Sequence, residues 1–268
     1  MKNLTILLFL SIELFAKTSI ATYDVEHTLL GKIATADVIK KLDGENYTAE
    51  LIITTTGLAA TFSDNLQKHF ISQGTLKKGV FYPDVLAVTE KRDEQERYII
   101  YRFDHKNKIL HVDKCSNTLM TERTFDPSSF SFDEYKYEEF TYDSHRSKSY
   151  VKDDVISLFF NAKNYIQNRD DFKEISFMAA GIYDEEDDDI DGILAFGISQ
   201  KDIRDIIQTS ISNSMLLVAL SNRVFHEDDK WLYIDLNDDT LPQYVKLNDI
   251  AFGDVSVTRI LDNVVSSK

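Results

Sequence analysis

The chain has 268 residues, of which 43% are hydrophobic, so it can bury a sizeable core and is not expected to be disordered. Its formal net charge of −15 comes from 45 acidic and 30 basic residues, and no run of Lys and Arg interrupts the acidic balance. Such a surface repels phosphate backbones, which argues against nucleic acid as a partner and against charge-driven adhesion to anionic membranes. Thirteen Tyr and seventeen Phe residues beside only three Pro favour strands.

The N-terminus has the features of a secretory signal peptide. Lys2 precedes the apolar run 4–12, and small residues at Ala16 and Ala21 offer cleavage sites. The apolar run is shorter than the ~20 residues that a spanning helix needs. We therefore expect residues 1–21 to be removed and the mature protein to be periplasmic or secreted, with an uncleaved N-terminal anchor as the alternative.

After the signal, the sequence predicts a meander of strands joined by polar turns. Apolar and polar residues alternate between turn signals such as Asp43-Gly44 and Lys77-Lys78-Gly79. A short helical or irregular segment is expected at 58–65. The predicted strands are 23–30, 33–41, 47–56, 68–76, 84–91, 97–104 and 109–114.

The stretch 115–149 differs in composition and is interpreted as an inserted segment. It is rich in Ser, Thr, Asp and Glu, and it shows no helical period. Its aromatic residues alternate in part, which predicts an added strand or hairpin, and a mobile insertion is the alternative. These aromatic residues are Phe130, Phe132, Tyr135, Tyr137, Phe140 and Tyr142.

Two amphipathic helices are expected in the second half. Asp153 or Asp154 can cap the first, whose apolar residues recur at helical spacing. Ser199, with Asp202 three positions on, resembles a capping box that begins the second. Strands are expected at 172–183 and 193–198, and the stretch 216–225 leads into the terminal meander. The apolar positions of the first helix are Val155, Leu158, Phe159, Ala162 and Ile166, and those of the second are Ile203, Ile206, Ile207, Ile211 and Met215.

The stretch 224–259 shows the clearest strand pattern, and we expect the rest of the chain to be organised around it. Apolar and polar residues alternate there between polar turn clusters, which is typical of an antiparallel meander with one buried face. The predicted fold is mainly β with two helices: a curved antiparallel sheet or partly open barrel covered by helices. No linker or repeat divides residues 22–268, so a single β-rich domain is expected.

The order of elements resembles the exported bacterial proteins grouped as domain of unknown function family 3108. This resemblance spans most of the mature chain and implies a signal peptide, an envelope location and a curved antiparallel sheet, but no known reaction and no catalytic residues. The matching pieces are Tyr23-Asp24-Val25, Thr56-Gly57-Leu58, Gly79-x-x-Tyr82-Pro83, the helix start 154–160, the run 236–242 and Phe252-Gly253-Asp254-Val255.

One local pattern suggests a metal. Asp187, Asp189 and Asp191, followed by Gly192, match the first half of a calcium loop, in which alternating carboxylates converge on a hard cation. Position 12 of such a loop would be Ile198, where a bidentate Glu belongs. A solvated acidic turn between two strands is the alternative interpretation.

Other catalytic signatures are missing from the sequence. The six His residues show no zinc spacing, and there is no G-x-S-x-G, P-loop or G-x-G-x-x-G motif. Cys115 is the only cysteine, so no internal disulfide forms, and a lone cysteine is usually a small buried hydrophobe. We expect no enzymatic activity and no cofactor, apart from the calcium that the acidic run would bind.

The sequence therefore predicts a non-catalytic module that binds a lipid or another apolar component of the envelope in a cavity lined by aromatic residues. A filled core is the structural alternative to this cavity. Two other functions stay open: an envelope scaffold that binds a protein through 115–149 or a sheet edge, and a carboxylate-based hydrolase acting on glycans or lipids.

Overall fold

The computed structural model describes residues 17–166, 175–181, 193–198, 215–220, 231–236, 241–250 and 253–266. The apolar run of the predicted signal peptide, the acidic run at 184–191 and the helix expected after Ser199 lie outside these residues. Its strands are β1 (Lys17–His27), β2 (Gly31–Asp43), β3 (Asn46–Thr55), β4 (Gln67–Lys77), β5 (Val80–Lys91), β6 (Gln95–Asp104), β7 (Ile109–Asp126), β8 (Ser131–Arg146), β9 (Asp153–Asp154), β10 (Ile175–Ala180), β11 (Ile193–Ile198), β12 (Met215–Leu220), β13 (Trp231–Leu236), β14 (Pro242–Ile250) and β15 (Gly253–Ser266), and its helices are α1 (Gly57–Phe62) and α2 (Val155–Ile166).

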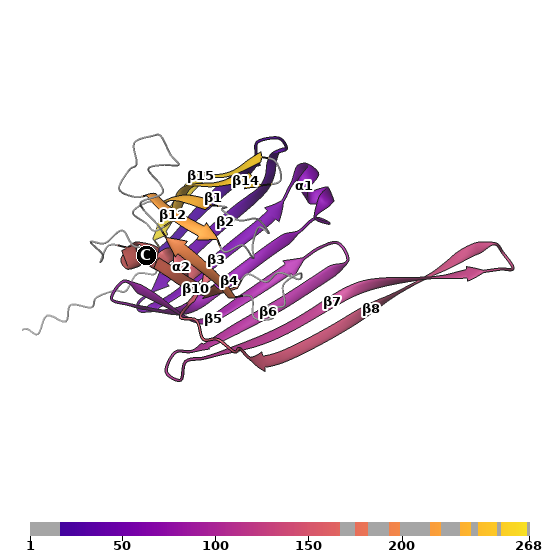
Figure 1. Cartoon of the computed structure of the whole chain (residues 1–268), viewed down its shortest axis with the longest axis horizontal. Coiled ribbons are helices and arrows are strands. Elements are labelled where there is room, and N and C mark those ends of the chain that lie inside the picture. Colours follow the sequence, from indigo (N-terminus) through magenta and orange to yellow (C-terminus); the bar gives the residue numbers. More distant parts are fainter. Residues whose placement is uncertain are drawn as a thin grey trace, which may run out of the picture.

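All the described strands belong to one sheet, in the order β8-β7-β6-β5-β4-β3-β2-β1-β15-β14-β13-β12-β11-β10-β9 (Figure 1). Each neighbouring pair is antiparallel except β9 and β10, which are parallel. The chain thus forms two meanders that meet where β1 pairs with β15, near the middle of the sheet. The prediction of a mainly β fold with an antiparallel sheet is confirmed.

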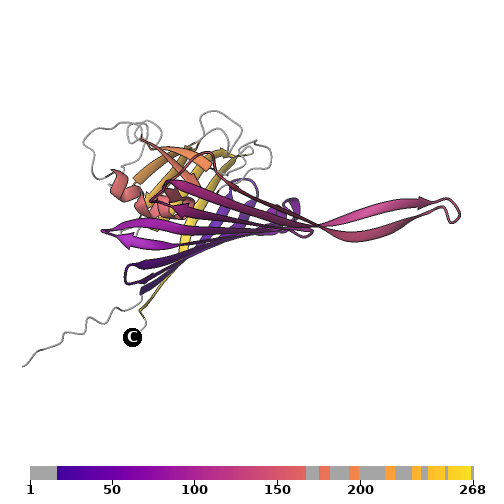
Figure 2. The same cartoon turned by 90° about the horizontal axis from the view of Figure 1, so that it is seen from below.

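The sheet curves strongly but does not close into a barrel. Its two edges are β8 and β9, and β9 contacts β5 without adding a ladder to it. Seen from below, strands of the second meander lie opposite those of the first, with α2 between them at one end (Figure 2). Strand twist accumulated over many neighbours produces this curvature.

The first meander follows the predicted alternation closely. In β6, Ile99, Tyr101 and Phe103 are buried and alternate with more exposed neighbours, as expected for a sheet with one covered face. The main correction concerns β1, which begins at Lys17 and ends at His27, so that residues 28–30 form a turn. This strand pairs on both sides from its first residue, and that pairing extends it beyond its local sequence signal.

The helix predicted after Asp154 is confirmed as α2. The Asp154 carboxylate accepts hydrogen bonds from the backbone N–H of Ile156 (2.9 Å) and of Ser157 (2.6 Å), which is the capping arrangement that the sequence predicts. Side chains of α2 belong to the main hydrophobic core, and the helix contacts β5, β9 and β10. By contrast, α1 is a short helix with no buried residue beside β2.

The hairpin predicted within the stretch 115–149 is confirmed. Residues 115–146, called the arm below, comprise most of β7 and all of β8 and project far from the rest of the sheet (Figure 1). β6 pairs with β7 only as far as Thr118. Beyond that residue the arm is a two-stranded ribbon of β7 and β8. Among the described helices, neither has the length and apolar character needed to cross a membrane.

Candidate ligand-binding cavity

The two meanders and α2 enclose a partly open cavity of about 420 Å³. Its walls come from the inner faces of β1–β4 on one side and of β13–β15 on the other, and α2 contributes a row of apolar side chains. Every lining residue in the described part of the chain is aliphatic or aromatic. They are Tyr23, Val25, Ala34, Ala36, Val38, Leu51, Ile53, Phe70, Val155, Ile156, Phe159, Phe160, Ile234, Leu241, Pro242, Val245, Leu247, Val255 and Val257.

Small side chains leave the space open where larger ones would fill it. In β2, Ala34 and Ala36 face inward at consecutive inner positions, and Val38 continues this row. Opposite them, Phe160 of α2 packs against Phe81 with ring centroids 5.0 Å apart. The packed aromatic rings therefore form one end of the cavity. The small alanine side chains leave its β2 wall unfilled.

A buried network attaches the start of α2 to the sheet. Ser72 donates a hydrogen bond to the Asp154 carboxylate (2.5 Å), and Tyr47 is hydrogen-bonded to the same Ser72 hydroxyl (3.0 Å). Burial raises the pKa of Asp154 to about 6, although hydrogen bonds from Ser157 and Ser72 oppose the shift. Burial, reinforced by the charge of Asp154, also raises the pKa of Tyr47 far above its ordinary value, so this phenol stays neutral.

Asn161 makes a second attachment about two turns further along α2. It accepts a hydrogen bond from the Phe81 N–H (2.8 Å) and donates to the Phe81 carbonyl (2.8 Å) and to the Asp153 carboxylate (2.9 Å). An amide that satisfies the backbone of a strand in this way fixes the helix against β5. These polar groups are fully or almost fully buried and hold the helix, so they are not accessible to a substrate.

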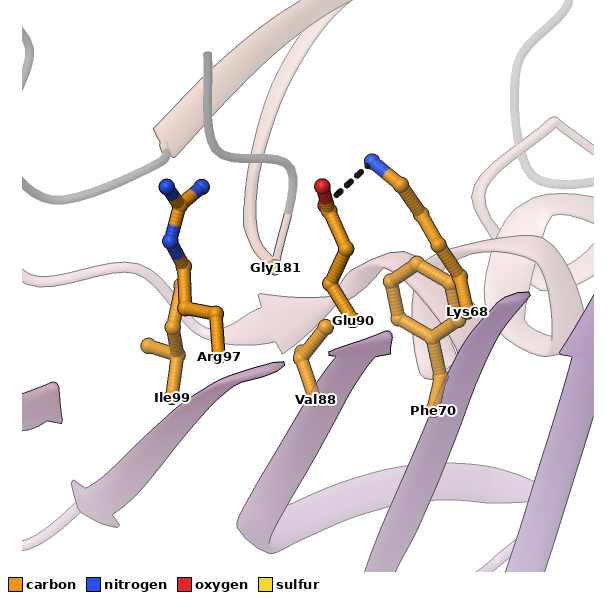
Figure 3. A pocket seen from close by; sticks show the side chains of 7 residues that line it. All are labelled: Lys68, Phe70, Val88, Glu90, Arg97, Ile99 and Gly181. Carbon is orange, nitrogen blue, oxygen red and sulfur yellow. Dashed lines mark ion pairs between the residues drawn. The ribbon is translucent and has the colours of Figure 1, made fainter. Parts of the chain in front are cut away.

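A charged cluster lies at the edge of the cavity, on the inner face of β4, β5 and β6. The Lys68 ammonium is 2.9 Å from the Glu90 carboxylate, and the Arg92 guanidinium is also 2.9 Å from it. Arg97 lies directly across from Glu90 on β6. Figure 3 shows Lys68 and Arg97 on either side of Glu90, with Phe70 and Val88 below them. We call Lys68, Glu90, Arg92 and Arg97 the rim cluster.

The rim cluster keeps its carboxylate ionised. Burial by itself would raise the pKa of Glu90, but the charge of Lys68, hydrogen bonds from Lys68 and Arg92, and the charge of Arg92 together hold this pKa below its ordinary value. The hollow among these residues has a volume of about 30 Å³, and Phe70 lines both this hollow and the large cavity. The charged hollow and the apolar cavity are therefore neighbours on either side of Phe70.

The histidine with the best-defined surroundings, His105, is held in a structural role. Its Nε2 donates to the Pro83 carbonyl (2.6 Å), so its Nδ1 accepts from the Tyr150 hydroxyl (2.6 Å). The ring also stacks on Phe103 with centroids 6.0 Å apart. Both ring nitrogens are thus engaged in joining β5, β6 and the segment before α2.

The residues predicted to bind calcium, Asp187, Asp189 and Asp191, lie outside the described part of the chain, and calcium binding stays a prediction. Within the described ranges, no three His, Cys, Asp or Glu side chains are grouped to hold a metal. Cys115 is a free thiol, half-buried on β7 at the base of the arm.

Sequence reasoning anticipated a cavity lined by aromatic residues but missed the residues that form it. It also missed the rim cluster. A signal for that cluster was present: Lys68, Glu90 and Arg97 all stand at positions that strand alternation assigns to the inner, mostly apolar face. A charge at such a position needs partners, and three on adjacent strands indicate a site.

The comparisons with known proteins identify no relative. No protein-family model, no curated protein and no solved structure matches the chain. The resemblance to domain of unknown function family 3108 therefore stays a prediction, and the function has to be argued from the cavity itself.

Proposed function

We propose that this protein is a non-catalytic module that binds an apolar molecule of the cell envelope in the cavity between the two meanders, with α2 covering one end of the curved sheet. The observation that carries this proposal is the cavity of about 420 Å³ whose lining residues are all aliphatic or aromatic. Ligand pockets of small molecules have volumes of roughly 300–1,000 Å³ and mostly apolar walls. Burial of a ligand's apolar surface there would drive binding.

The buried polar groups support binding rather than catalysis. Asp153, Asp154 and Asn161 are occupied in holding α2, and none of them lines the cavity. A carboxylate-based hydrolase needs two acids exposed to a substrate on either side of the scissile bond. Among the described residues that line the cavity, none is an acid.

The proposal is tested with a neutral fluorescent probe, N-phenyl-1-naphthylamine, titrated into delipidated full-length protein. Ala36→Phe should fill the cavity and weaken probe binding by about tenfold or more, because the new ring occupies the ligand's space. Thr35→Phe is the matched control, since it adds the same ring to the opposite face of β2. Val38→Phe serves as a second blocking variant if Ala36→Phe does not fold.

Saturable binding by the wild type and the Thr35→Phe control, lost in the blocking variants, supports the proposal. Absence of saturable binding by the wild type would refute it. Native mass spectrometry of protein purified from a periplasm adds an independent test, because a bound lipid would appear as extra mass that dissociates on activation.

Export to the periplasm is part of this proposal. It is supported by Lys2 and the apolar run 4–12. Of the two cleavage sites, Ala16 is favoured, since β1 begins at Lys17 and both Ser19 and Ala21 are buried. Cleavage after Ala21 would remove five residues that pair with β2 and β15. N-terminal sequencing of the exported protein distinguishes the two sites.

A second candidate function, binding of an envelope protein, is supported by the arm. Phe125, Phe130 and Phe132 form an exposed cluster at its tip, where the ring centroids of Phe125 and Phe132 are 5.3 Å apart. β8 is also an edge strand with a free side, to which a partner strand can be added.

The test of this second function is a shortened arm. Residues 119–138 are replaced by an Asn-Gly turn that joins Thr118 to Glu139, which face each other across the hairpin. The shortened protein should keep its fold and its probe binding but lose any envelope protein that the wild type captures. Equal capture by both proteins would exclude the arm as the binding surface.

A further inference from the structure

We propose that the arm joins two copies of this chain, with the outer edge of β8 pairing antiparallel with β8 of a second copy around a two-fold axis at Tyr137. This inference does not depend on the cavity or its ligand. It deepens the second candidate function, because it names the protein that the arm binds.

The strand β8 presents a long open edge. It is the outermost described strand of the sheet, and no proline interrupts its sixteen residues. Beyond Thr118 it lies beside β7 alone, and the arm projects away from the rest of the described chain (Figure 1). Such an edge offers a row of backbone N–H and C=O groups to a further strand. A two-stranded ribbon is marginally stable by itself, so joining two ribbons into a four-stranded sheet stabilises both.

One face of β8 combines exposed aromatic rings with charges of both signs. Phe132, Phe140 and Tyr142 are 64%, 68% and 65% exposed. Because side chains alternate along a strand, these rings share their face with Lys136 and Glu138. Exposed apolar side chains that gather on one surface mark an interaction site. A strand added to this edge therefore has to supply apolar contacts and opposite charges along the same face.

A second copy of β8 supplies both. Around a two-fold axis at Tyr137, residues equally far from Tyr137 along the chain, on its two sides, face each other. Lys136 of each copy then faces Glu138 of the other, and Phe132 of each copy faces Tyr142 of the other. The symmetry makes each of these pairs occur twice. Opposite charges and aromatic pairs that face each other across a ladder stabilise it.

The same register keeps the acidic side chains of the two copies apart. The acids Asp133, Glu134, Glu139 and Asp143 face Thr141, Phe140, Tyr135 and Ser131. Moving the axis by one residue is the smallest shift that keeps facing side chains on one face, and it places Lys136 opposite Lys136 or Glu138 opposite Glu138. Like charges directly opposite each other are destabilising. The charge pattern therefore selects the axis at Tyr137.

Pairing between copies also limits the assembly. Both copies use the same edge, so the contact is isologous and the dimer leaves neither β8 edge open. An exposed strand edge is otherwise a site of aggregation. A symmetric dimer thus uses the open edge without extending into a fibre.

The first test is disulfide cross-linking of full-length protein in which Cys115→Ser removes the native thiol. Tyr137→Cys places a thiol on the axis, facing its counterpart with Cα atoms about 5 Å apart, within the range of a disulfide. Mild oxidation with copper phenanthroline should link this variant into a dimer. Tyr135→Cys is the matched control: it lies on the same face, but its counterpart is about 13 Å away along the strands, so it should stay unlinked. It should link when mixed with Glu139→Cys protein, whose thiol it faces.

A charge exchange tests the register without a covalent link. Lys136→Glu and Glu138→Lys should each weaken the dimer by about tenfold or more in sedimentation equilibrium, because two attractive pairs become repulsive. The double variant Lys136→Glu/Glu138→Lys should dimerise as the wild type does, since both pairs return with their signs exchanged. Lys41→Glu changes the net charge as Lys136→Glu does, but it lies on β2, away from the arm, and should leave the dimer unchanged.

Several results would overturn the inference. A wild type that stays monomeric throughout the micromolar range would exclude the dimer, and capture of a different envelope protein by that monomer would assign the edge to another partner. A dimer that survives replacement of residues 119–138 by the Asn-Gly turn would place the interface elsewhere. Cross-linking of Tyr135→Cys by itself, or no recovery in the double variant, would exclude the axis at Tyr137. Probe binding is measured on the same preparations: its absence refutes the cavity, whereas its retention by a monomeric wild type refutes only the dimer.

Discussion

The cavity and the arm use aromatic residues in opposite ways. Around the cavity, Tyr23, Phe70 and Phe160 are buried, and the first of them is only 3% exposed. On the arm, Phe130 and Phe140 are 86% and 68% exposed. Both regions consist of antiparallel strands with alternating side chains, so the strand pattern alone does not decide whether a ring is buried.

What separates the two regions is the presence of a second layer. The inner face of β1–β4 is opposed by the second meander and by α2, which cover much of it. The arm extends beyond β6 as a ribbon with no described element over either face, and a two-stranded hairpin cannot bury its own side chains. Its aromatic residues are therefore available to a partner, whereas those of the cavity are available only to a ligand.

The largest expected difference follows from truncating one ring in each region. Phe81 lies between Tyr47 and Phe160, with ring centroids 5.1 and 5.0 Å away. Phe81→Ala should lower the free energy of unfolding by about 4 kcal/mol, because a large buried side chain is removed and a cavity remains. Phe140→Ala on the arm should change it by less than about 0.5 kcal/mol. Urea unfolding followed by circular dichroism measures both, and similar losses would contradict the comparison.

The attachment of α2 provides a second test with a matched pair. Asn161→Ala should cost about 3 kcal/mol of unfolding free energy, since it leaves the N–H and carbonyl of Phe81 buried without their partner. Asn164, three residues further on, reaches the Gly79 carbonyl from the surface (2.6 Å), and Asn164→Ala should cost less than about 1 kcal/mol. Chemical denaturation compares the two. If the costs were equal, the buried amide would not be what anchors the helix.

The buried acid makes stability in this region depend on pH. Because the pKa of Asp154 is raised to about 6, the folded protein binds its proton more tightly than the unfolded chain does. The contribution of this group to the free energy of unfolding is therefore greatest below the ordinary Asp pKa of about 4 and is lost as the pH rises through 6.

The measurement for this prediction is a series of urea unfolding curves between pH 4 and pH 7.5. Asp154→Asn keeps a capping oxygen but does not titrate, so the difference in stability between wild type and variant should change across this window and level off above it. A constant difference at all these pH values would show that Asp154 has an ordinary pKa.

The smallest expected difference in unfolding free energy is between two variants that each break one ion pair. Lys68→Met should lower the free energy of unfolding by about 1 kcal/mol, because the Glu90 carboxylate is mostly buried and loses the ammonium while keeping its ion pair with Arg92. Arg123→Met breaks the exposed pair with Glu134 on the arm and should cost less than about 0.5 kcal/mol. Thermal unfolding at low and high salt measures both. A larger salt-dependent loss in the arm variant would reverse the comparison.

Local signals predicted most of the individual elements. The strand at 193–198 was predicted with the bounds that β11 has, and the capping residue of α2 was among the two that were named. Both features depend on neighbouring residues alone: a period of two for the strand, and a side-chain oxygen near free backbone N–H groups for the helix start. The prediction that 115–149 includes a hairpin succeeded for the same reason.

The sequence by itself determined which side chains share a face of each strand, because side-chain alternation is a local property of the extended chain. Only the tertiary structure decided that β1 pairs with β15, more than two hundred residues away, and thereby brought the two meanders around one cavity. The registers between the successive strands β2 to β6 placed Lys68, Glu90 and Arg97 in one row with Ala36 and Ile53. Such sites depend on register between strands, and register is selected by the packing of the whole sheet rather than by any single segment.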